Sequence, residues 1–206
     1  MKLQMIGVYI KNIGGVWFGV ACAGQQVFST SFAPSEQETL KNLLSSIPFN
    51  VSFQVFPEPS AFAASVLASV KNVYDGKCVS QSFSLATEHL SAYTQRVFEA
   101  TSLIPTGYVT SYGAIAKAAG GSPRSVGLVM ASNPFAPIVP CHRVVSSDFT
   151  LGGYGGGLTA KLKFLIREKR GYMSLREIPV GDRKLKFFPV EVVLRKLGKD
   201  QGLDCS

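Results

Sequence analysis

Pro140-Cys141-His142-Arg143-Val144 places a thiol directly beside an imidazole at the end of an apolar run. A thiol is inert until it becomes a thiolate, and a neighbouring base or positive charge lowers its pKa. Ser132-Asn133-Pro134 precedes this stretch, and the glycine-rich segment Gly152-Gly153-Tyr154-Gly155-Gly156-Gly157 follows it. The pattern indicates a nucleophilic cysteine; a buried, inert thiol is the alternative.

Two short helices joined by glycines are predicted directly upstream. Ser111 caps a helix over residues 112–119 that ends at Gly120-Gly121. Ser122 caps the next helix, which has Pro123 at its first position. Helix, glycine turn, helix is typical of the helix-turn-helix motif, although any two short helices joined by Gly-Gly give the same pattern.

The bulk composition permits a nucleic-acid partner. The chain has 206 residues and a formal net charge of +8, with a sequence pI of about 9.4 and a mean hydropathy of +0.20. These values are typical of a globular protein of one large or two small domains. A basic balance favours polyanions, but many basic proteins bind no nucleic acid.

The cysteines and histidines are too few and too scattered for a metal site. There is no closely spaced cysteine pair, and only two histidines are present. We therefore expect no metal and no cofactor. Cys22 and Cys78 are candidates for a disulfide, but reduced, buried thiols are favoured. The residues concerned are Cys22, Cys78, Cys141, Cys205, His89 and His142.

The N-terminus faintly resembles a secretory signal, with Lys2 before apolar residues and Val20-Ala21-Cys22 further on. Lys11-Asn12 and Gly14-Gly15 interrupt the apolar run, so no signal core is left. No stretch reaches the ~18 apolar residues that a membrane span needs. We expect a soluble protein without a membrane partner, in the cytoplasm, or in the nucleus if the source is eukaryotic.

The first half is predicted to form a platform domain over residues 1–80. Three apolar runs, residues 5–10, 16–23 and 27–32, indicate a three-stranded antiparallel meander. Ser35 caps a following helix, residues 53–56 suggest a further strand, and residues 59–72 look helical. No catalytic constellation is apparent in this half.

The second predicted domain covers residues 85–171. Helical spacing begins at Leu85 and stops at Pro105-Thr106-Gly107. A last helix is predicted over residues 158–170, with Gly171 as its C-cap. Residues 172–206, which mix Lys and Arg with Phe and Val, form a C-terminal extension to which we assign no chemistry.

Several motifs occur in one order and together resemble the O6-alkylguanine-DNA alkyltransferases, also called methylated-DNA–protein-cysteine methyltransferases. The resemblance is strong over residues 85–171, weak over the N-terminal half and absent from the extension. The motifs are Tyr112, Ser122-Pro123-Arg124-Ser125-Val126-Gly127, Ser132-Asn133-Pro134, Pro140-Cys141-His142-Arg143-Val144, the glycine segment with Leu158, and Glu168.

The resemblance implies a fold of the α+β or α/β class: an N-terminal three-stranded antiparallel sheet with helices, then a mainly helical domain with a winged helix-turn-helix-like motif. It implies DNA repair by direct damage reversal. A monomer would bind duplex DNA through the minor groove, flip a guanine alkylated at O6, and move the methyl or alkyl group onto Cys141. The thioether is permanent, so such a suicide enzyme acts once.

The resemblance also implies the roles of the reacting groups. Cys141 is the nucleophile, His142 the base that reaches it through a water, and Glu168 the group that orients the imidazole. A solvated, salt-bridging carboxylate is the alternative for Glu168. Helical spacing places Glu168 on one face with Lys161 and Leu165, which favours an inward direction.

Three further residues are implied near the chemistry. Tyr112 would donate a proton or hydrogen bond to N3 of the leaving guanine, unless it only packs on the core. Asn133 would order the turn before the active-site strand. Lys161 matches a family lysine close to the site, and a surface lysine is the alternative.

The remaining implied residues contact DNA or the flipped base. Arg124 would fill the space that the base leaves, or contact phosphate, while Ser125 and Gly127 keep the helix slim for the minor groove. The capped helix N-termini offer backbone N–H groups to phosphates. These caps are Ser111 and Ser122.

The pocket for the base would be formed by three residues. Tyr154 would line it, and the carbonyl of Val144 would accept from the exocyclic amine. Many family members have a serine where this chain has Gly155, so here a backbone N–H would face O6 and the loop would be more mobile.

Other readings remain open. A lesion-binding relative without transfer activity lacks the cysteine that is present here. A helix-turn-helix regulator leaves the Cys141-His142 pair and the glycine segment unexplained. A cysteine hydrolase would have no reason for a DNA-reading module.

Overall fold

The computed structural model describes residues 5–47, 51–181 and 183–198, which form two compact units. The first unit contains residues 1–74, 78–89 and 134–138. The second contains residues 75–77, 90–133 and 139–206. The domain boundaries drawn from the sequence stay predictions.

The first unit is built on a five-stranded sheet in the order β4-β1-β2-β3-β5. The predicted meander is present, but the sheet is mixed, since two short strands pair in parallel with its edges. The predicted three-stranded antiparallel sheet therefore had too few strands. The strand at residues 53–56 was suggested by the sequence, whereas the strand at residues 84–85 is too short to show a period. The strands are β1 (Ile6–Ile13), β2 (Val16–Ala23), β3 (Gln26–Ala33), β4 (Phe53–Phe56) and β5 (Ser84–Leu85).

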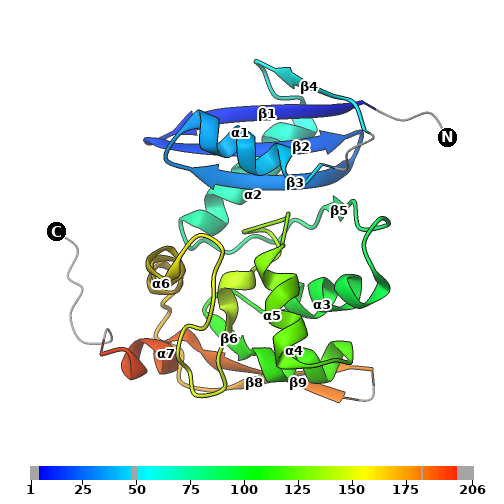
Figure 1. Ribbon diagram of the computed structural model, residues 1–206. Coiled ribbons are helices and arrows are strands. Elements are labelled where there is room, and N and C mark those ends of the chain that lie inside the picture. The colour runs from blue at the N-terminus through cyan, green and yellow to red at the C-terminus, as the bar shows by residue number, and fades with distance from the viewer. Residues whose placement is uncertain (1–4, 48–50, 182, 199–206) are drawn as a thin grey trace. The chain divides into compact units, whose positions relative to one another are not determined.

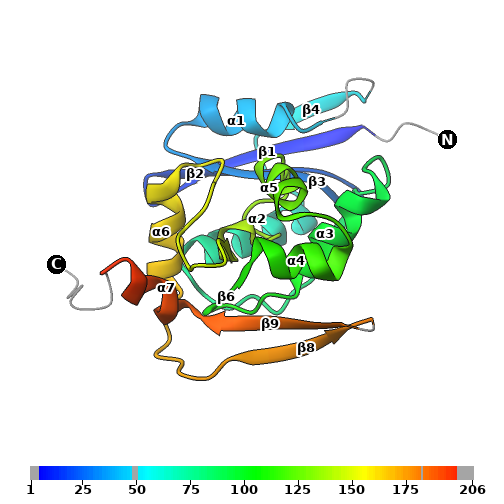
Figure 2. The same ribbon diagram turned by 60° about the horizontal axis from the view of Figure 1, so that its bottom comes forward.

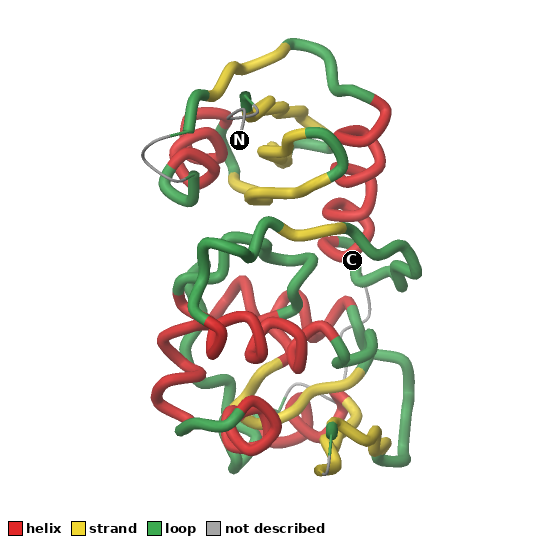
Figure 3. The backbone as a smooth tube through the Cα atoms, turned by 90° about the vertical axis from the view of Figure 1, so that its right-hand side faces the viewer, coloured by secondary structure: helices red, strands yellow, loops and turns green. Residues whose placement is uncertain are grey.

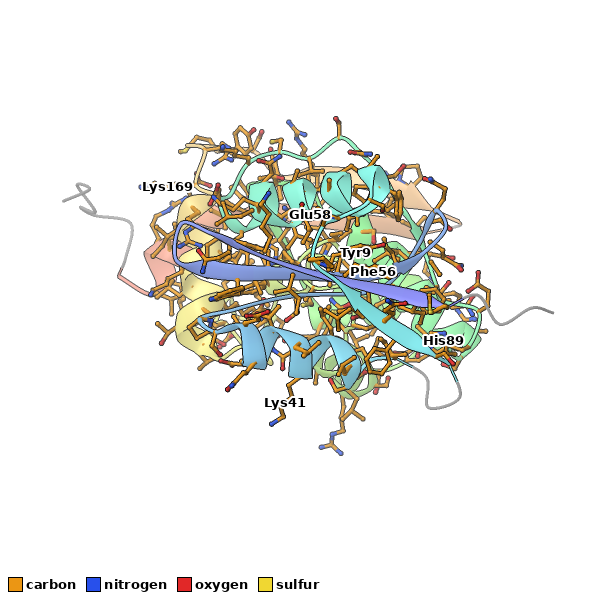
Figure 4. The ribbon with its side chains drawn as sticks, turned by 90° about the horizontal axis from the view of Figure 1, so that it is seen from above. Tyr9, Lys41, Phe56, Glu58, His89 and Lys169 are labelled. Carbon is orange, nitrogen blue, oxygen red and sulfur yellow. The ribbon has the colours of Figure 1, made fainter. Side chains whose placement is uncertain are left out.

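Helices α1 (Glu36–Leu44) and α2 (Ala61–Tyr74) cover opposite faces of this sheet (Figures 3 and 4). Leu43 of α1 packs so closely that a Cβ added at Gly19 would lie 2.6 Å from its side chain. Tyr9 and Phe56 stack at 5.5 Å between ring centroids, which joins β4 to β1 (Figure 4).

The second unit begins with helix α3 (Ala92–Ser102) and strand β6 (Tyr108–Ser111) (Figure 1). Helices α4 (Tyr112–Ala119) and α5 (Pro123–Ala131) follow, with Ser111 and Ser122 as the predicted caps. A short 3-10 helix η1 (Cys141–Arg143), strand β7 (Val144–Val145) and helix α6 (Leu158–Arg167) complete the part that the sequence described.

Two predicted helix ends were wrong. Helix α3 begins at Ala92 rather than near Leu85, because Ser91 caps it by accepting the N–H of Thr94. Helix α6 ends at Arg167 instead of continuing to 170, and Glu168 is its C-cap. Gly171, with φ of 72°, lies beyond the helix end.

The C-terminal extension folds, which the sequence analysis did not predict. Strands β8 (Arg176–Val180) and β9 (Arg183–Pro189) form a hairpin, and helix α7 (Val190–Lys196) follows. Strand β9 pairs with β6 and gives a four-stranded sheet in the order β7-β6-β9-β8. Figure 2 shows the β8–β9 hairpin beside β6. Buried Leu185 and Phe187 alternate with exposed lysines, a strand pattern in retrospect.

Cys22, Cys78 and Cys141 are free thiols, and Cys205 lies outside the described residues. None of the helices in the described part of the chain combines the length and apolar character that a membrane crossing requires.

Candidate active site

Cys141 opens η1 and lines a pocket of about 310 Å³ within the second unit. Its side chain is largely buried, with 5% of the residue exposed. The pocket therefore presents the sulfur to a small molecule or a single base without exposing it on the surface. The lining residues are Tyr112, Pro123, Gly127, Met130, Ala131, Cys141, Gly153, Tyr154 and Gly155.

His142, the residue after Cys141, belongs to a buried group of three charged or polar side chains with Arg143 and Glu168. His142 Nε2 lies 3.0 Å from Glu168 Oε1. Arg143 donates to both oxygens of the same carboxylate, with Nε 2.9 Å from Oε2 and Nη2 2.8 Å from Oε1. Arg143 also donates to the carbonyl of Ile104 at 2.7 Å, so its charge is paired and its hydrogen bonds are met.

This arrangement fixes the charge state of Glu168. Burial alone would raise the pKa of the carboxyl, but the charges and hydrogen bonds of His142 and Arg143 outweigh it and lower the pKa to about 2. Glu168 is therefore a carboxylate at neutral pH, and a carboxylate only accepts hydrogen bonds. The proton between the two side chains then belongs to His142 Nε2.

The other ring nitrogen of His142 is consequently the basic one. Burial, together with the positive charges of Arg143 and Lys161, lowers the pKa of His142 more than Glu168 raises it, so the imidazole is neutral at neutral pH. Nδ1 is buried and has no hydrogen-bond partner among the described residues. Phe164 stacks on the ring at 4.5 Å between centroids and holds its plane. The structure thus presents a neutral imidazole whose free lone pair is on Nδ1.

The thiol of Cys141 is influenced by opposing effects. Burial raises its pKa, while a hydrogen bond from the Asn133 side chain and the positive charge of Lys161 lower it. Asn133 also donates from Nδ2 to the carbonyl of Val139, 2.9 Å away. Asn133 therefore ties the segment before the cysteine and stabilises the thiolate when it forms.

Lys161 is fully buried, which excludes the surface lysine considered from the sequence. Its Nζ donates to the carbonyls of Val144 at 2.5 Å and Gly153 at 3.1 Å. Burial lowers the pKa of Lys161 to about 8, and the negative charge of Cys141 acts in the opposite direction. The lysine joins the strand after Cys141 to the glycine segment.

Two tyrosines form walls of the pocket. The hydroxyl of Tyr112 donates to the carbonyl of Gly153 at 3.0 Å. Tyr154 packs edge-on against Phe164 at 6.4 Å between ring centroids. Burial, and then the negative charge of Cys141, raises the pKa of each tyrosine, so both keep their protons at neutral pH.

The outer face of α5 carries small or apolar residues around one arginine. Arg124 is exposed, and Gly127 has open space where a Cβ would stand. Leu128 is 70% exposed and lies about 40° from Arg124 around the helix, at about 100° per residue. Ser125 instead faces Tyr93 of α3, with 2.9 Å between the hydroxyls, and it completes a capping box with Ser122.

Of two residues predicted to form the base pocket, Gly155 lines the pocket and Val144 does not. Gly155 lines the pocket, and a Cβ added there would lie 3.8 Å from the carbonyl of Ala131. Val144 is buried, is absent from the lining, and offers its carbonyl to Lys161. A carbonyl has two lone pairs, so acceptance from a guanine amine stays a prediction.

The comparisons with known proteins identify the family of this chain. Residues 92–170 match the family model described as 6-O-methylguanine DNA methyltransferase, DNA binding domain. The methylated-DNA–protein-cysteine methyltransferase of Mycobacterium leprae is 42% identical over 123 residues, which are 57% of this chain and 72% of that protein. The chain belongs to the methylated-DNA–protein-cysteine methyltransferase family.

Other members of this methyltransferase family extend the agreement. The protein of Pyrobaculum aerophilum is 58% identical over 65 residues, but the match spans only 32% of this chain and 44% of that protein. The crystal structure of O6-methylguanine-DNA methyltransferase from Pyrococcus kodakaraensis has 30% identity and a TM-score of 0.61. The match covers 80% of this chain and 99% of the Pyrococcus chain.

A second solved structure is Mycobacterium tuberculosis OGT in complex with DNA, with 29% identity and a TM-score of 0.61 over 79% of this chain and 92% of that one. The predicted family and the predicted fold class are confirmed. A partner role for DNA is supported, since this relative was solved with it.

Sequence reasoning missed two residues near the candidate site. Arg143 was quoted only as part of a motif, although an arginine among buried valines needs a carboxylate partner, and this signal points to Glu168. Leu128 was overlooked, although it shares the outer face of α5 with Arg124 and is exposed.

Proposed function

We propose that this protein repairs DNA by moving a methyl or alkyl group from O6 of guanine to the sulfur of Cys141, once per molecule. The observation that carries the proposal is that Cys141 lines the pocket and is followed in η1 by His142, whose imidazole is paired with the buried Glu168. Family membership supports the same reaction.

The reaction is a displacement at an sp³ carbon. The thiol proton of Cys141 passes through a water to His142, whose Nδ1 has the free lone pair. A bond forms between sulfur and the alkyl carbon as the bond from that carbon to O6 breaks. Glu168 stabilises the imidazolium that results, because its low pKa keeps it negative.

The guanine leaves with negative charge on its ring. Tyr112, protonated and at the pocket wall, donates its proton or a hydrogen bond to N3. The proton that His142 accepted then passes through solvent, either to restore Tyr112 or to neutralise the guanine. The products are neutral guanine and a thioether on Cys141. Since no group in the site reverses a thioether, each molecule acts once.

Duplex DNA meets the second unit through α5 and the helix N-termini at Ser111 and Ser122. Arg124 enters the stack behind the flipped base, and the slim face at Gly127 approaches the minor groove. Tyr154 and Gly155 line the base pocket. The protein acts as a monomer in the compartment that holds the DNA.

A peptide mass spectrum after incubation with a duplex bearing O6-methylguanine tests the proposal. The Cys141 peptide should gain one methyl group per molecule, and Cys141→Ala should bind the duplex but accept nothing. DNA binding without a modified Cys141 would favour a binding-only protein or a regulator instead. Turnover of an ester or amide would favour a hydrolase.

A further inference from the structure

The C-terminal extension, residues 172–198, lies outside the matched family model, which ends at residue 170. In the structure it is part of the second unit (Figure 2). Its helix α7 places Val190, Val193 and Leu194 in one buried cluster with Val109, Val145 and Leu165. These partners belong to β6, β7 and α6, the elements that carry or flank the site residues.

The extension braces the strand that leads to Tyr112. In β9, Pro189 pairs with Tyr108 and Phe188 with Val109. The hydroxyl of Thr110 donates to the carbonyl of Lys186 at 2.7 Å. One residue of β6 later the chain turns into α4 at Tyr112, so the extension holds the approach to this pocket wall.

A second contact reaches the turn after Glu168. Glu191 of α7 is only 4% exposed, and its Oε1 accepts the backbone N–H groups of Arg170 at 3.0 Å and Tyr172 at 3.2 Å. The N–H of Gly171 donates to the same oxygen. Successive N–H groups that converge on one oxygen form an anion nest, which a full negative charge stabilises best.

The nest begins two residues after Glu168 in the chain. Glu168 is the C-cap of α6, and its own N–H donates to the carbonyl of Phe164 at 3.0 Å. Little space is left around it, since a Cβ added at Gly107 would lie 3.2 Å from the Glu168 carbonyl and 2.9 Å from the Tyr172 ring. Movement of the turn at residues 170–172 therefore moves the Glu168 backbone.

We propose that Glu191 is a positioning residue for the transfer reaction: by binding the turn at residues 170–172 it fixes Glu168, and through Glu168 the imidazole of His142. The kinetic test of this inference rests on the proposed function, because it measures the transfer reaction. The positioning of Glu168 by Glu191 gives the extension a role that the family model does not contain, because the frame of the catalytic group is completed by α7.

Glu191→Gln and Glu191→Ala test the proposal, with Glu177→Gln as the matched control. Glu177 is a carboxylate of the same extension, but its partners are the exposed Lys184 and Lys186, at 3.7 and 3.2 Å. The substrate is free O6-benzylguanine, which removes DNA binding from the measurement. Since each molecule reacts once, the amount of product at the end point gives the amount of folded protein. The rate constant gives the speed of the transfer step.

The expected result is a rate constant about tenfold lower in Glu191→Gln, with a full end point. The rising limb of the rate against pH should move to lower pH, because a displaced Glu168 raises the pKa of His142 less. Glu177→Gln should match the wild type. An unchanged rate constant, or a loss seen only in the end point, would overturn the positioning role. If Glu191→Ala does not fold, Glu191→Gln alone decides.

A measurement independent of transfer separates this inference from the proposed function. The proton NMR resonance of His142 Nε2–H reports its hydrogen bond to Glu168 in the unreacted protein. It should shift in Glu191→Gln and stay in place in Glu177→Gln. If the resonance stays in place in Glu191→Gln, the positioning role is contradicted even if transfer occurs. If the wild type transfers nothing, only the proposed function is contradicted.

Discussion

Glu168 Oε1 lies 3.0 Å from His142 Nε2, with both side chains fully buried, and Arg143 binds the same carboxylate. The carboxylate therefore has two tasks at once. It accepts the hydrogen bond of the His142 imidazole, the proposed base, and it neutralises a buried guanidinium that would otherwise destabilise the fold.

Glu168→Gln should consequently weaken both the fold and the reaction. Loss of the negative charge leaves Arg143 buried without a counter-charge, which costs about 3–5 kcal/mol of unfolding free energy. Urea unfolding at neutral pH measures this loss. Glu177→Gln, which breaks only surface ion pairs, should change the unfolding free energy by less than about 1 kcal/mol. Equal effects of the two substitutions would contradict the pairing.

The same carboxylate should give the wild type a specific acid sensitivity. The pKa of Glu168 is lowered from 4.5 to about 2, so the folded state favours the ionised form. Its contribution to stability is complete above 4.5 and is lost as the pH falls towards 2. Urea unfolding across this range should show a smaller loss in Glu168→Gln. Curves that fall in parallel would be inconsistent with the lowered pKa.

The sequence predicted what short-range signals determine. Ser111 and Ser122 cap their helices as expected, since a capping serine needs only the next few residues. The pairing of Arg143 with Glu168, 25 residues apart, depends on how α6 packs and has no local signature. The same holds for strand β9, because a strand is defined by its partner, here β6. Cys141, Tyr112 and Tyr154 line one pocket, as expected from the sequence, whereas the frame around them was not predicted.

Lys161→Met should slow the reaction with free O6-benzylguanine by about tenfold at neutral pH. The substitution removes a buried positive charge that lowers the pKa of Cys141. It also removes the hydrogen bonds from Lys161 to the carbonyls of Val144 and Gly153. Lys163→Met is the control, since Lys163 is exposed on the same helix. Two variants with equal rate constants would show that the charge of Lys161 has no part in the reaction.

Arg124→Ala should lower repair of duplex DNA about tenfold or more while leaving the reaction with the free base unchanged. The arginine is exposed on α5 and does not line the pocket, so its effect requires the duplex. Lys41→Ala removes a charge from α1, where Figure 4 shows the side chain pointing into solvent, and should change neither rate. A loss on both substrates would argue against an intercalating role.

Leu128→Glu should act like Arg124→Ala on the two substrates. Leu128 is 70% exposed beside Arg124, so a carboxylate there meets the phosphates of bound DNA without disturbing the core. Leu103→Glu provides the control, since Leu103 is 44% exposed at the end of α3. If Leu128→Glu repairs duplex DNA at the wild-type rate, this face of α5 does not contact DNA.

Gly155→Ser and Gly152→Ser should have opposite effects on the reaction with free O6-benzylguanine. A Cβ at Gly155 would lie 3.8 Å from the carbonyl of Ala131, an ordinary contact, and the hydroxyl would enter the pocket as a donor for O6. One such hydrogen bond is worth about 1 kcal/mol, or about fivefold in rate.

Gly152 has φ of +65°, and a Cβ there would lie 2.7 Å from the Tyr112 ring. A serine at this position strains the backbone and displaces the proton donor, so the rate constant should fall. Stopped-flow fluorescence or mass spectrometry of the single turnover measures both variants. Since the two glycines belong to one segment, a general loosening of that segment would slow both, and only a substitution-specific contact raises one rate while lowering the other.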